Sequence, residues 1–427
     1  MQANKAMRWW GVITLFVIVA ISYIDRINIS VLITDPAFLA HVGLAREDRL
    51  SQGLLATAFM VGYGVSSVVL TPLAAALLGV RRSLLVGLML WGVVTFLSPA
   101  LDSFGLLLAS RVLLGVSEGP VFALASAYIK AHFESRENGK PNSFVNMGTG
   151  LGLAIGFPLV GYLLATHDWQ TSFHVLGVIN IVLGIPLVLA FVHMPRRVEA
   201  GSAKAPSASA ALAQVGHMVR GALQTRHLML VTLLTSAFLA YLWGSSNWLP
   251  SYLKDARGFS LREMGWLASL PQYATVVAVL VGGFIIDRIP RRSVPLMFVY
   301  CSVGVALAVG IAIETDHRYL AAYSLVAANF CWGLMSPAIP STVQHFSRPE
   351  HVASGYGVVN GVGSLVAGFM PALMGSVIAH AATPRAGFLA GFGALIGTQA
   401  VVLLCGLVLW LRERAAERAG AEEGLVA

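Results

Sequence analysis

Long apolar stretches follow one another along the chain, and short polar segments separate them. Residues 9–24, 84–99, 173–192 and 386–411 are examples, and such stretches approach or exceed the roughly 20 residues that a helix needs to cross a hydrocarbon core. They are continuously apolar, whereas the strands of a membrane barrel alternate between polar and apolar positions. Because lipid offers no partner to backbone groups, the pattern predicts spanning helices, which satisfy their backbone hydrogen bonds internally.

The pattern predicts an all-α membrane protein with twelve spanning helices. The expected spans are residues 9–34, 51–78, 82–100, 104–130, 142–166, 172–193, 227–253, 263–287, 293–314, 318–344, 352–380 and 386–411. Between residues 195 and 226 the hydrophobicity falls, and the stretch is rich in Ala and Ser. We therefore expect a six-helix bundle over 1–194, a cytoplasmic linker over 195–226, and a second six-helix bundle with a short cytoplasmic tail over 227–427.

A basic turn recurs at the same place in the two expected bundles, directly after the second helix of each. It contains Arg81 and Arg82 in the first bundle and Arg288, Arg291 and Arg292 in the second. Repeated bundles are typical of transporters, because two similar halves can rock about a central site. The fifth and eleventh spans are rich in glycine, which lets helices approach closely. Tight packing alone, or packing at a moving contact, would explain these glycines.

The charge of the chain agrees with a membrane protein. Only 11 % of the residues are charged, against roughly a quarter in a soluble domain, so a soluble fold is excluded. The net charge of +8 could suggest nucleic acid, but the placement of Lys and Arg explains it better. Most of these basic residues lie in the tails and on the N-terminal side of the membrane, so we expect both termini in the cytoplasm. We therefore expect no nucleic-acid partner, and we expect the protein to lie in the inner membrane. The opposite side has seven: Arg46, Arg49, Lys254, Arg257, Arg262, Arg318 and Arg385.

Cysteine and histidine give no sign of a metal or a cofactor. Cys301, Cys331 and Cys405 lie far apart inside expected helices, where they behave as small apolar residues. The histidines lie mainly in loops or at helix ends and show no paired metal-binding spacing. We therefore expect no cofactor and no enzyme activity. The first apolar stretch is too long for a secretory signal and has no small-residue cleavage site, so it is expected to be a retained helix.

Four charged residues lie inside the expected spans: Asp25, Arg26, Arg111 and Glu118. A charge at this depth costs about 2.5–3.5 kcal/mol on insertion scales, so each should face a partner or a wet cavity. Arg111 and Glu118 are seven residues apart, a rise of about 10 Å along a helix, which is too far for direct pairing. Each therefore needs a partner on another helix, and the adjacent Asp25 and Arg26 are the charged candidates.

These four charges allow a structural and a functional interpretation. They could be buried ion pairs that hold the first and fourth helices together, although burying ions is weak evidence for stability. A transport role explains them better, because an arginine keeps its charge and can hold an anion, whereas a carboxylate can be neutralised. Protonation of Glu118 or Asp25 would then free an arginine for the cargo, so that proton and anion bind with positive coupling.

Two segments resemble a known family. Residues 23–30 (Tyr-Ile-Asp-Arg-Ile-Asn-Ile-Ser) and 111–120 (Arg-Val-Leu-Leu-Gly-Val-Ser-Glu-Gly-Pro) look like the anion:cation symporter family of the major facilitator superfamily. Its members include bacterial transporters of galactonate, glucarate and hexuronates, others for tartrate or aromatic carboxylates, and the animal carrier sialin. The resemblance extends over almost the whole chain. It implies the major facilitator fold, in which two pseudo-symmetric six-helix bundles alternate access to a central site.

The resemblance also implies roles for individual residues. Arg26 would bind the carboxylate of the cargo, Asp25 and Glu118 would carry protons, and Arg111 would hold an acid in its charged form. The other expected cavity residues are aromatic or carry an amide: Tyr23, Tyr63 and Asn360 match the family, and Asn247 and Trp332 would complete the pocket from the second bundle. For each of these, packing or an interfacial position is the competing interpretation.

Two departures from the family pattern limit the resemblance. The acid that normally precedes the first basic turn is missing from residues 71–79, so the inner gate is expected to depend on Asp287, Arg288 and Arg291 of the second copy. Ser67 stands where a glutamine is usual in the second helix. A less hydroxylated or aromatic carboxylate is therefore more plausible than the family's sugar acids alone would suggest.

We predict a monomeric secondary transporter that takes up a small organic anion, such as a sugar acid or another carboxylate, together with protons. Efflux of a drug or metabolite by proton antiport is the main alternative. Efflux of cationic drugs would favour an acid-lined pocket, whereas the first helix supplies an arginine. A membrane enzyme or a sensor is the third possibility, and no residue pattern supports it.

Overall fold

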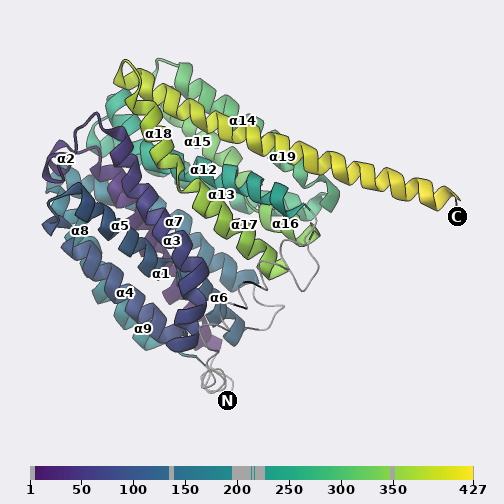
Figure 1. Cartoon of the computed structure of the whole chain (residues 1–427), viewed down its shortest axis with the longest axis horizontal. Helices are drawn as coiled ribbons and strands as arrows, with labels where there is room; N and C mark the ends of the chain where they lie inside the picture. Colours follow the sequence, from purple (N-terminus) through teal and green to yellow (C-terminus); the bar gives the residue numbers. More distant parts are fainter. Residues whose placement is uncertain are drawn as a thin grey trace. The chain divides into compact units, whose positions relative to one another are not determined.

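The computed structural model describes residues 5–133, 139–194, 227–346 and 352–426, together with residues 213 and 216 (Figure 1). The described residues are 88 % helical and contain no strand. The prediction of an all-α protein is therefore confirmed. Most of the linker expected over 195–226 lies outside the described residues, so the division of the chain at that point stays a prediction.

Helices occupy all twelve expected positions within the described residues. In the first half of the sequence they are α1 (Lys5–Leu32), α3 (Arg49–Leu77), α4 (Gly79–Leu97), α5 (Phe104–Glu118) followed by α6 (Val121–His132), α7 (Gly139–Thr166), and α8 (Trp169–Ile179) followed by η2 (Asn180–Gly184) and α9 (Ile185–Phe191). In the second half they are α12 (Leu228–Ser251), α13 (Leu261–Arg288), α14 (Pro295–Glu314), α15 (Arg318–Met335) followed by α16 (Ala338–Phe346), α17 (Val352–Ala367) followed by α18 (Met370–Ala379), and α19 (Pro384–Val426).

Four of the expected spans contain two α-helices each. Pro120 and Pro337 lie at two of these breaks, and Pro371 lies in the first turn of α18, directly after the third. Proline cannot donate the backbone hydrogen bond that would continue the helix. The fourth, α8 to α9, is joined by the π-helical turn η2. Asp168 begins this span by accepting hydrogen bonds from the backbone and the hydroxyl group of Thr171, which lower the pKa of Asp168.

Ten helices of the described part are long and apolar enough to cross a membrane. The two other expected spans correspond to α3 and to α15 with α16. The chain is therefore a multi-pass membrane protein. The short helix α2 (Pro36–His41) lies between the first two spans.

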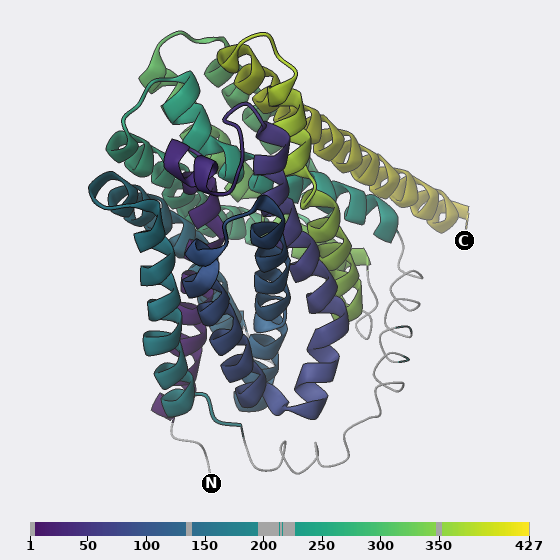
Figure 2. The same cartoon turned by 60° about the vertical axis from the view of Figure 1, so that its left-hand side comes forward.

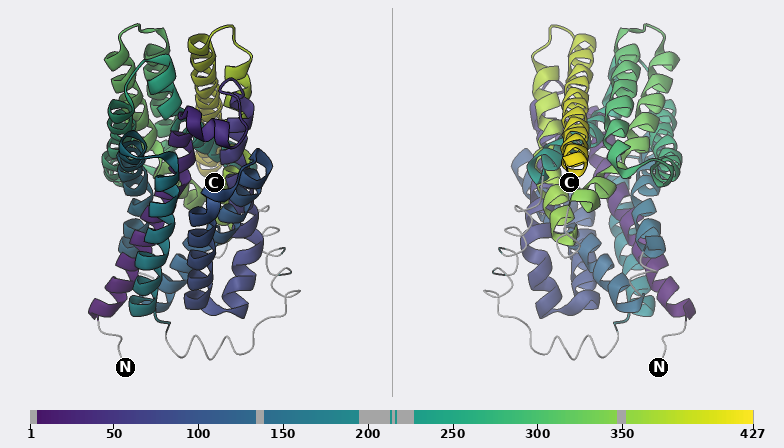
Figure 3. Two further views of the ribbon diagram at one scale, coloured as in Figure 1. Left: turned by 90° about the vertical axis from the view of Figure 1, so that its left-hand side faces the viewer. Right: turned by 90° about the vertical axis from the view of Figure 1, so that its right-hand side faces the viewer.

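Two compact units make up the chain. The first contains residues 1–215, 246–270 and 371–387, and the second contains residues 216–245, 271–370 and 388–427. In the second unit, α14 packs against α15, and a short loop joins these two green helices in Figure 3. The end of α12 and the beginning of α13 belong to the first unit.

Glycines bring the helices of the first unit into close contact. A Cβ atom on Gly152 of α7 would lie 2.3 Å from the carbonyl oxygen of Ala20 in α1. A Cβ atom on Gly115 of α5 would lie 2.1 Å from the carbonyl oxygen of Phe59 in α3. Any side chain would collide at these positions, so glycine allows α1 to lie against α7 and α3 against α5 (Figures 1 and 2). The close approach expected for the glycines of the fifth span is confirmed.

Candidate functional site

A buried ion pair joins α1 to α5. Ser22 and Arg26 lie one helical turn apart on α1 and therefore share a face. Ser22 Oγ donates to Glu118 Oε2 at 2.6 Å, and Arg26 Nε donates to the same oxygen at 3.2 Å. Both charged side chains are buried, and Glu118, the last residue of α5, is 0 % exposed. The sequence suggested that Glu118 needs a partner on the first span, and Arg26 is that partner.

Aromatic rings surround the Arg26 guanidinium. Its central carbon lies 4.2 Å from the ring centre of Tyr23, 4.4 Å from that of Tyr63 and 5.0 Å from that of Phe59. Ring faces attract a cation, and the attraction is stronger where water is excluded. The structure therefore brings together Arg26, Tyr23 and Tyr63, which the resemblance assigned to the cargo site. Phe59 was not among the expected site residues.

Asp25 faces a different helix from Arg26, because adjacent residues point about 100° apart on a helix. Asn180 Nδ2, from the sixth span, donates to Asp25 Oδ2 at 2.6 Å, and both side chains are buried. Sequence reasoning considered only charged partners and missed Asn180. The signal that could have found it is an amide in the middle of an otherwise apolar span.

Arg111 completes the buried charges, which we call the four-charge cluster: Asp25, Arg26, Arg111 and Glu118. Its side chain is buried, and its guanidinium carbon lies 5.2 Å from the ring centre of Phe59. The charges of Glu118, Asp25 and Arg26 all act on it. Arg111 Nε has no hydrogen-bond partner among the described residues. Its expected role, to keep an acid charged, stays a prediction.

The remaining expected pocket residues are distributed over both units. In the first unit, Asn247 Oδ1 accepts a hydrogen bond from Ser30 Oγ at 3.3 Å. In the second unit, Trp332 donates from Nε1 to the carbonyl oxygen of Phe238 at 2.9 Å and stacks on the ring of that residue. Asn360 is exposed on α17. Their part in a pocket stays a prediction.

The expected gate residues lie near the end of α13. Arg288 is exposed and donates to the carbonyl oxygen of Phe284 in its own helix at 3.1 Å. Arg291 donates to Ser341 Oγ of α16 at 2.6 Å. The side chain of Asp287 lies outside the described residues, as do most side chains of 71–77. The expectation that the inner gate depends on the second basic turn, because the first lacks an acid, therefore stays a prediction.

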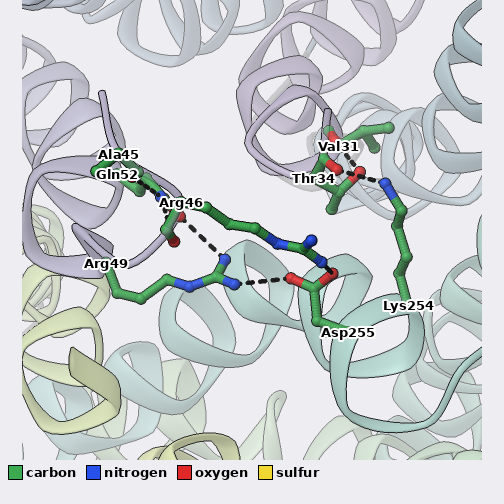
Figure 4. A network of polar contacts seen from close by, with 8 residues as sticks. All are labelled: Val31, Thr34, Ala45, Arg46, Arg49, Gln52, Lys254 and Asp255. Atoms are coloured by element: carbon green, nitrogen blue, oxygen red, sulfur yellow. Dashed lines mark hydrogen bonds and ion pairs between the residues drawn. The ribbon is translucent and has the colours of Figure 1, made fainter. Parts of the chain in front are cut away.

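A second set of charges, missed by sequence reasoning, lies in the same unit (Figure 4). Arg46 Nη2 donates to Asp255 Oδ1 and Arg49 Nη2 donates to Asp255 Oδ2, each at 2.8 Å. Gln52 accepts from Arg49 at 3.1 Å and donates to the carbonyl oxygens of residues 45 and 46 at the same distance. We call Arg46, Arg49, Gln52 and Asp255 the Asp255 cluster. The adjacent Lys254 donates to the carbonyl oxygen of Thr34.

The long apolar helices and the buried charges between them define a membrane transporter of the helical-bundle class. A sequence model described as the Major Facilitator Superfamily matches residues 15–371. The chain therefore belongs to the major facilitator superfamily, whose members are transporters and not enzymes. The superfamily resemblance seen in the sequence is confirmed.

Known relatives and solved structures agree with this assignment. A probable sulfoacetate transporter of Cupriavidus necator is 31 % identical over 68 % of this chain and 67 % of its own length. A hexuronate transporter of Bacillus subtilis is 25 % identical over 96 % of each chain. The crystal structure of a D-xylose–proton symporter has a TM-score of 0.75 at 14 % identity, over 94 % of this chain and 97 % of that one, which shows the shared fold.

Proposed function

We propose that the protein carries a small organic anion across the bacterial inner membrane together with protons. The observation that carries this proposal is the buried pair of Arg26 and Glu118, with aromatic rings around the Arg26 guanidinium. A permanently charged arginine can bind an anion, and the carboxylate that occupies it can be neutralised by a proton. The names of the relatives, which include transporters of sulfoacetate and hexuronate, support the same class of cargo.

The transport cycle rests on competition for one guanidinium. While Glu118 is charged, it occupies Arg26 and keeps the cargo away. A proton on Glu118 removes the charge of the partner, and a buried arginine without a counter-charge is strongly unfavourable, so the carboxylate of the cargo takes the vacated place. Proton and anion therefore bind cooperatively. Each charge moved across the membrane is worth about 2.3 kcal/mol per 100 mV, so an anion with excess protons is driven inward.

The Arg26 guanidinium favours an acidic cargo, such as a sugar acid or another small carboxylate. Tyr23, Tyr63 and Phe59 provide ring surface beside the guanidinium, and the hydroxyl groups of the tyrosines can bind a polar group of the cargo. Asn247, Trp332 and Asn360 would supply further contacts from the second half of the sequence. This arrangement favours galactonate, glucarate, a hexuronate or an aromatic carboxylate.

Several further properties belong to this proposal. Both termini lie in the cytoplasm, because the basic residues gather in the tails and the loops of that side. The protein works as a monomer of two six-helix bundles, over 1–194 and 227–427, which alternate access to the cargo. Asp287, Arg288 and Arg291 contribute to the gate on the cytoplasmic side.

Uptake into proteoliposomes tests the proposal. Purified protein should accumulate radiolabelled galactonate, glucuronate or phthalate only when an inward proton gradient is imposed, and Arg26→Ala should abolish this uptake. Arg318→Ala is the matched control, because Arg318 also lies over a tyrosine ring, at 4.9 Å from Tyr319, but is exposed at a helix end. Uptake that survives Arg26→Ala, or that ignores pH, would refute the proposed function.

A further inference from the structure

Asp25 and Asn180 form a buried pair in which two oxygens remain without partners. Asn180 Nδ2 donates to Asp25 Oδ2 at 2.6 Å, and the two side chains are 0 % and 2 % exposed. Asp25 Oδ1 and Asn180 Oδ1 have no hydrogen-bond partner among the described residues. A buried polar atom without a partner is costly, so this arrangement calls for an explanation.

A single proton would satisfy both oxygens. A charged carboxylate can only accept hydrogen bonds, whereas a protonated one gains a donor. A proton bound to Asp25 Oδ1 can be donated to Asn180 Oδ1, while the existing bond from Asn180 Nδ2 to Asp25 Oδ2 remains. The acid and the amide then form a ring closed by two hydrogen bonds. The proton comes from water on one side of the membrane, forms an O–H bond that neutralises Asp25, and leaves as that bond breaks toward the other side.

We propose that Asn180 is a positioning residue that prepares Asp25 to hold one transported proton, at a place separate from the pair of Arg26 and Glu118. This inference rests on the proposed function, and it assigns a different role to each of the two acids. Glu118 competes directly with the cargo for Arg26, whereas Asp25 has an uncharged partner that the cargo does not replace.

The surrounding helices hold the amide in place. Asn180 begins the π-helical turn η2, and such turns occur frequently at functional sites. A Cβ atom on Gly92 of α4 would lie 3.2 Å from the Cβ atom of Asn180 and 2.7 Å from Ile181. Only glycine at position 92 therefore lets α4 approach the turn this closely. The charged groups that act on Asp25 are Glu118, Arg111 and Arg26, and none of them occupies its free oxygen.

Infrared difference spectra between high and low pH can detect this proton in the purified protein without any cargo. The carboxylic C=O band of protonated Asp25 is identified by its loss in Asp25→Asn. In Asn180→Leu, the band should move to higher frequency, because the C=O group has lost the amide donor. Asn146→Leu is the matched control and should leave the band in place, since Asn146 is an exposed amide on α7 that donates to the carbonyl oxygen of Asn142 in its own helix.

A variant in which the acid and the amide exchange places adds a test that does not depend on the Asn180→Leu substitution. Asp25→Asn combined with Asn180→Asp keeps one acid and one amide in the pair, so it should restore a carboxylic band that Asp25→Asn alone lacks. In proteoliposomes, Asn180→Leu should reduce proton-driven accumulation at least tenfold and spare cargo exchange. An unshifted band in Asn180→Leu, or its undiminished accumulation, would overturn the inference. If the band shifts in Asn180→Leu but the wild-type protein shows no proton-driven uptake, the proposed function is refuted and the pairing of Asp25 with Asn180 is supported.

Discussion

The Glu118 site and the Asp255 cluster both pair arginine with a buried carboxylate, but they are built differently. Glu118 receives Arg26 on one oxygen, at 3.2 Å, and its other oxygen has no partner among the described residues. Asp255 receives a separate arginine on each oxygen, both at 2.8 Å. Short charge-assisted bonds to both oxygens are the stronger arrangement. The difference agrees with the proposal that Glu118 releases its arginine, and it favours a structural role for Asp255.

The surroundings of the two sites strengthen this contrast. Three aromatic rings lie around Arg26 and can continue to hold its guanidinium when Glu118 is neutralised. Gln52 holds the side chain of Arg49 through a hydrogen bond. The backbone of Arg49 packs closely against Gly375, where a Cβ atom would lie 2.2 Å from the carbonyl oxygen of Arg49. These surroundings agree with the proposed roles, an exchangeable ion pair at Glu118 and a structural one at Asp255.

The largest effect should follow from Glu118→Gln. The glutamine imitates the protonated acid, so Arg26 is permanently available to the cargo and no proton can be released at this position. Proton-driven accumulation in proteoliposomes should be abolished, while exchange of labelled for unlabelled cargo continues. Cargo affinity should also lose its dependence on pH. Normal accumulation in this variant would contradict the contrast between an exchangeable and a fixed carboxylate.

The next effect, on stability, should follow from Arg49→Ala. The side chain of Arg49 is 7 % exposed and that of Asp255 is 4 % exposed, so the change leaves a buried carboxylate with one partner. Removal of one member of a buried pair costs about 3–5 kcal/mol, and the remaining Arg46 should keep the loss near the lower value. The unfolding temperature of the detergent-purified protein should drop clearly. Arg262→Ala, at an exposed arginine of α13, serves as the control and should leave it unchanged.

The helices and part of the site could be predicted from the sequence, because they depend on local properties. The length of an apolar stretch is sufficient to place a spanning helix. Asp25, Arg26, Arg111 and Glu118 were recognisable because charges are rare in spans, and the pairing of Arg26 with Glu118 follows from the need of each for a partner. These inferences require no knowledge of how each helix is rotated.

The residues that sequence reasoning missed depend on three-dimensional packing. The direction in which Asp25 points is set by the contact of α1 with glycine-rich α7, so the choice of Asn180 as partner could not be read from either segment alone. Asp255 lies beside basic residues in the π-helical turn η3 (Tyr252–Ala256) and binds arginines about 200 residues earlier in the chain. Nothing in its local sequence separates it from an ordinary solvated loop acid.

A smaller effect on cargo binding should follow from Tyr63→Leu, which removes one of the rings around Arg26. A cation–π contact in a desolvated place contributes up to about 2 kcal/mol, so the dissociation constant of the cargo should rise by no more than about 30-fold. Tyr63→Phe keeps the ring and should show less of this loss. If Tyr63→Phe and Tyr63→Leu weaken binding equally, the hydroxyl group of Tyr63, and not its ring face, contributes to cargo binding.

The smallest effect should follow from Arg46→Ala, which removes the other arginine from Asp255. The side chain of Arg46 is 57 % exposed, so water already screens this ion pair despite the distance of 2.8 Å. Exposed pairs contribute about 0–1 kcal/mol, and salt weakens them further. The unfolding temperature should therefore fall less than in Arg49→Ala, and the difference from the wild type should shrink at high salt. A loss equal to that of Arg49→Ala would show that both arginines hold the carboxylate equally, and burial would then not explain the strength of the Asp255 cluster.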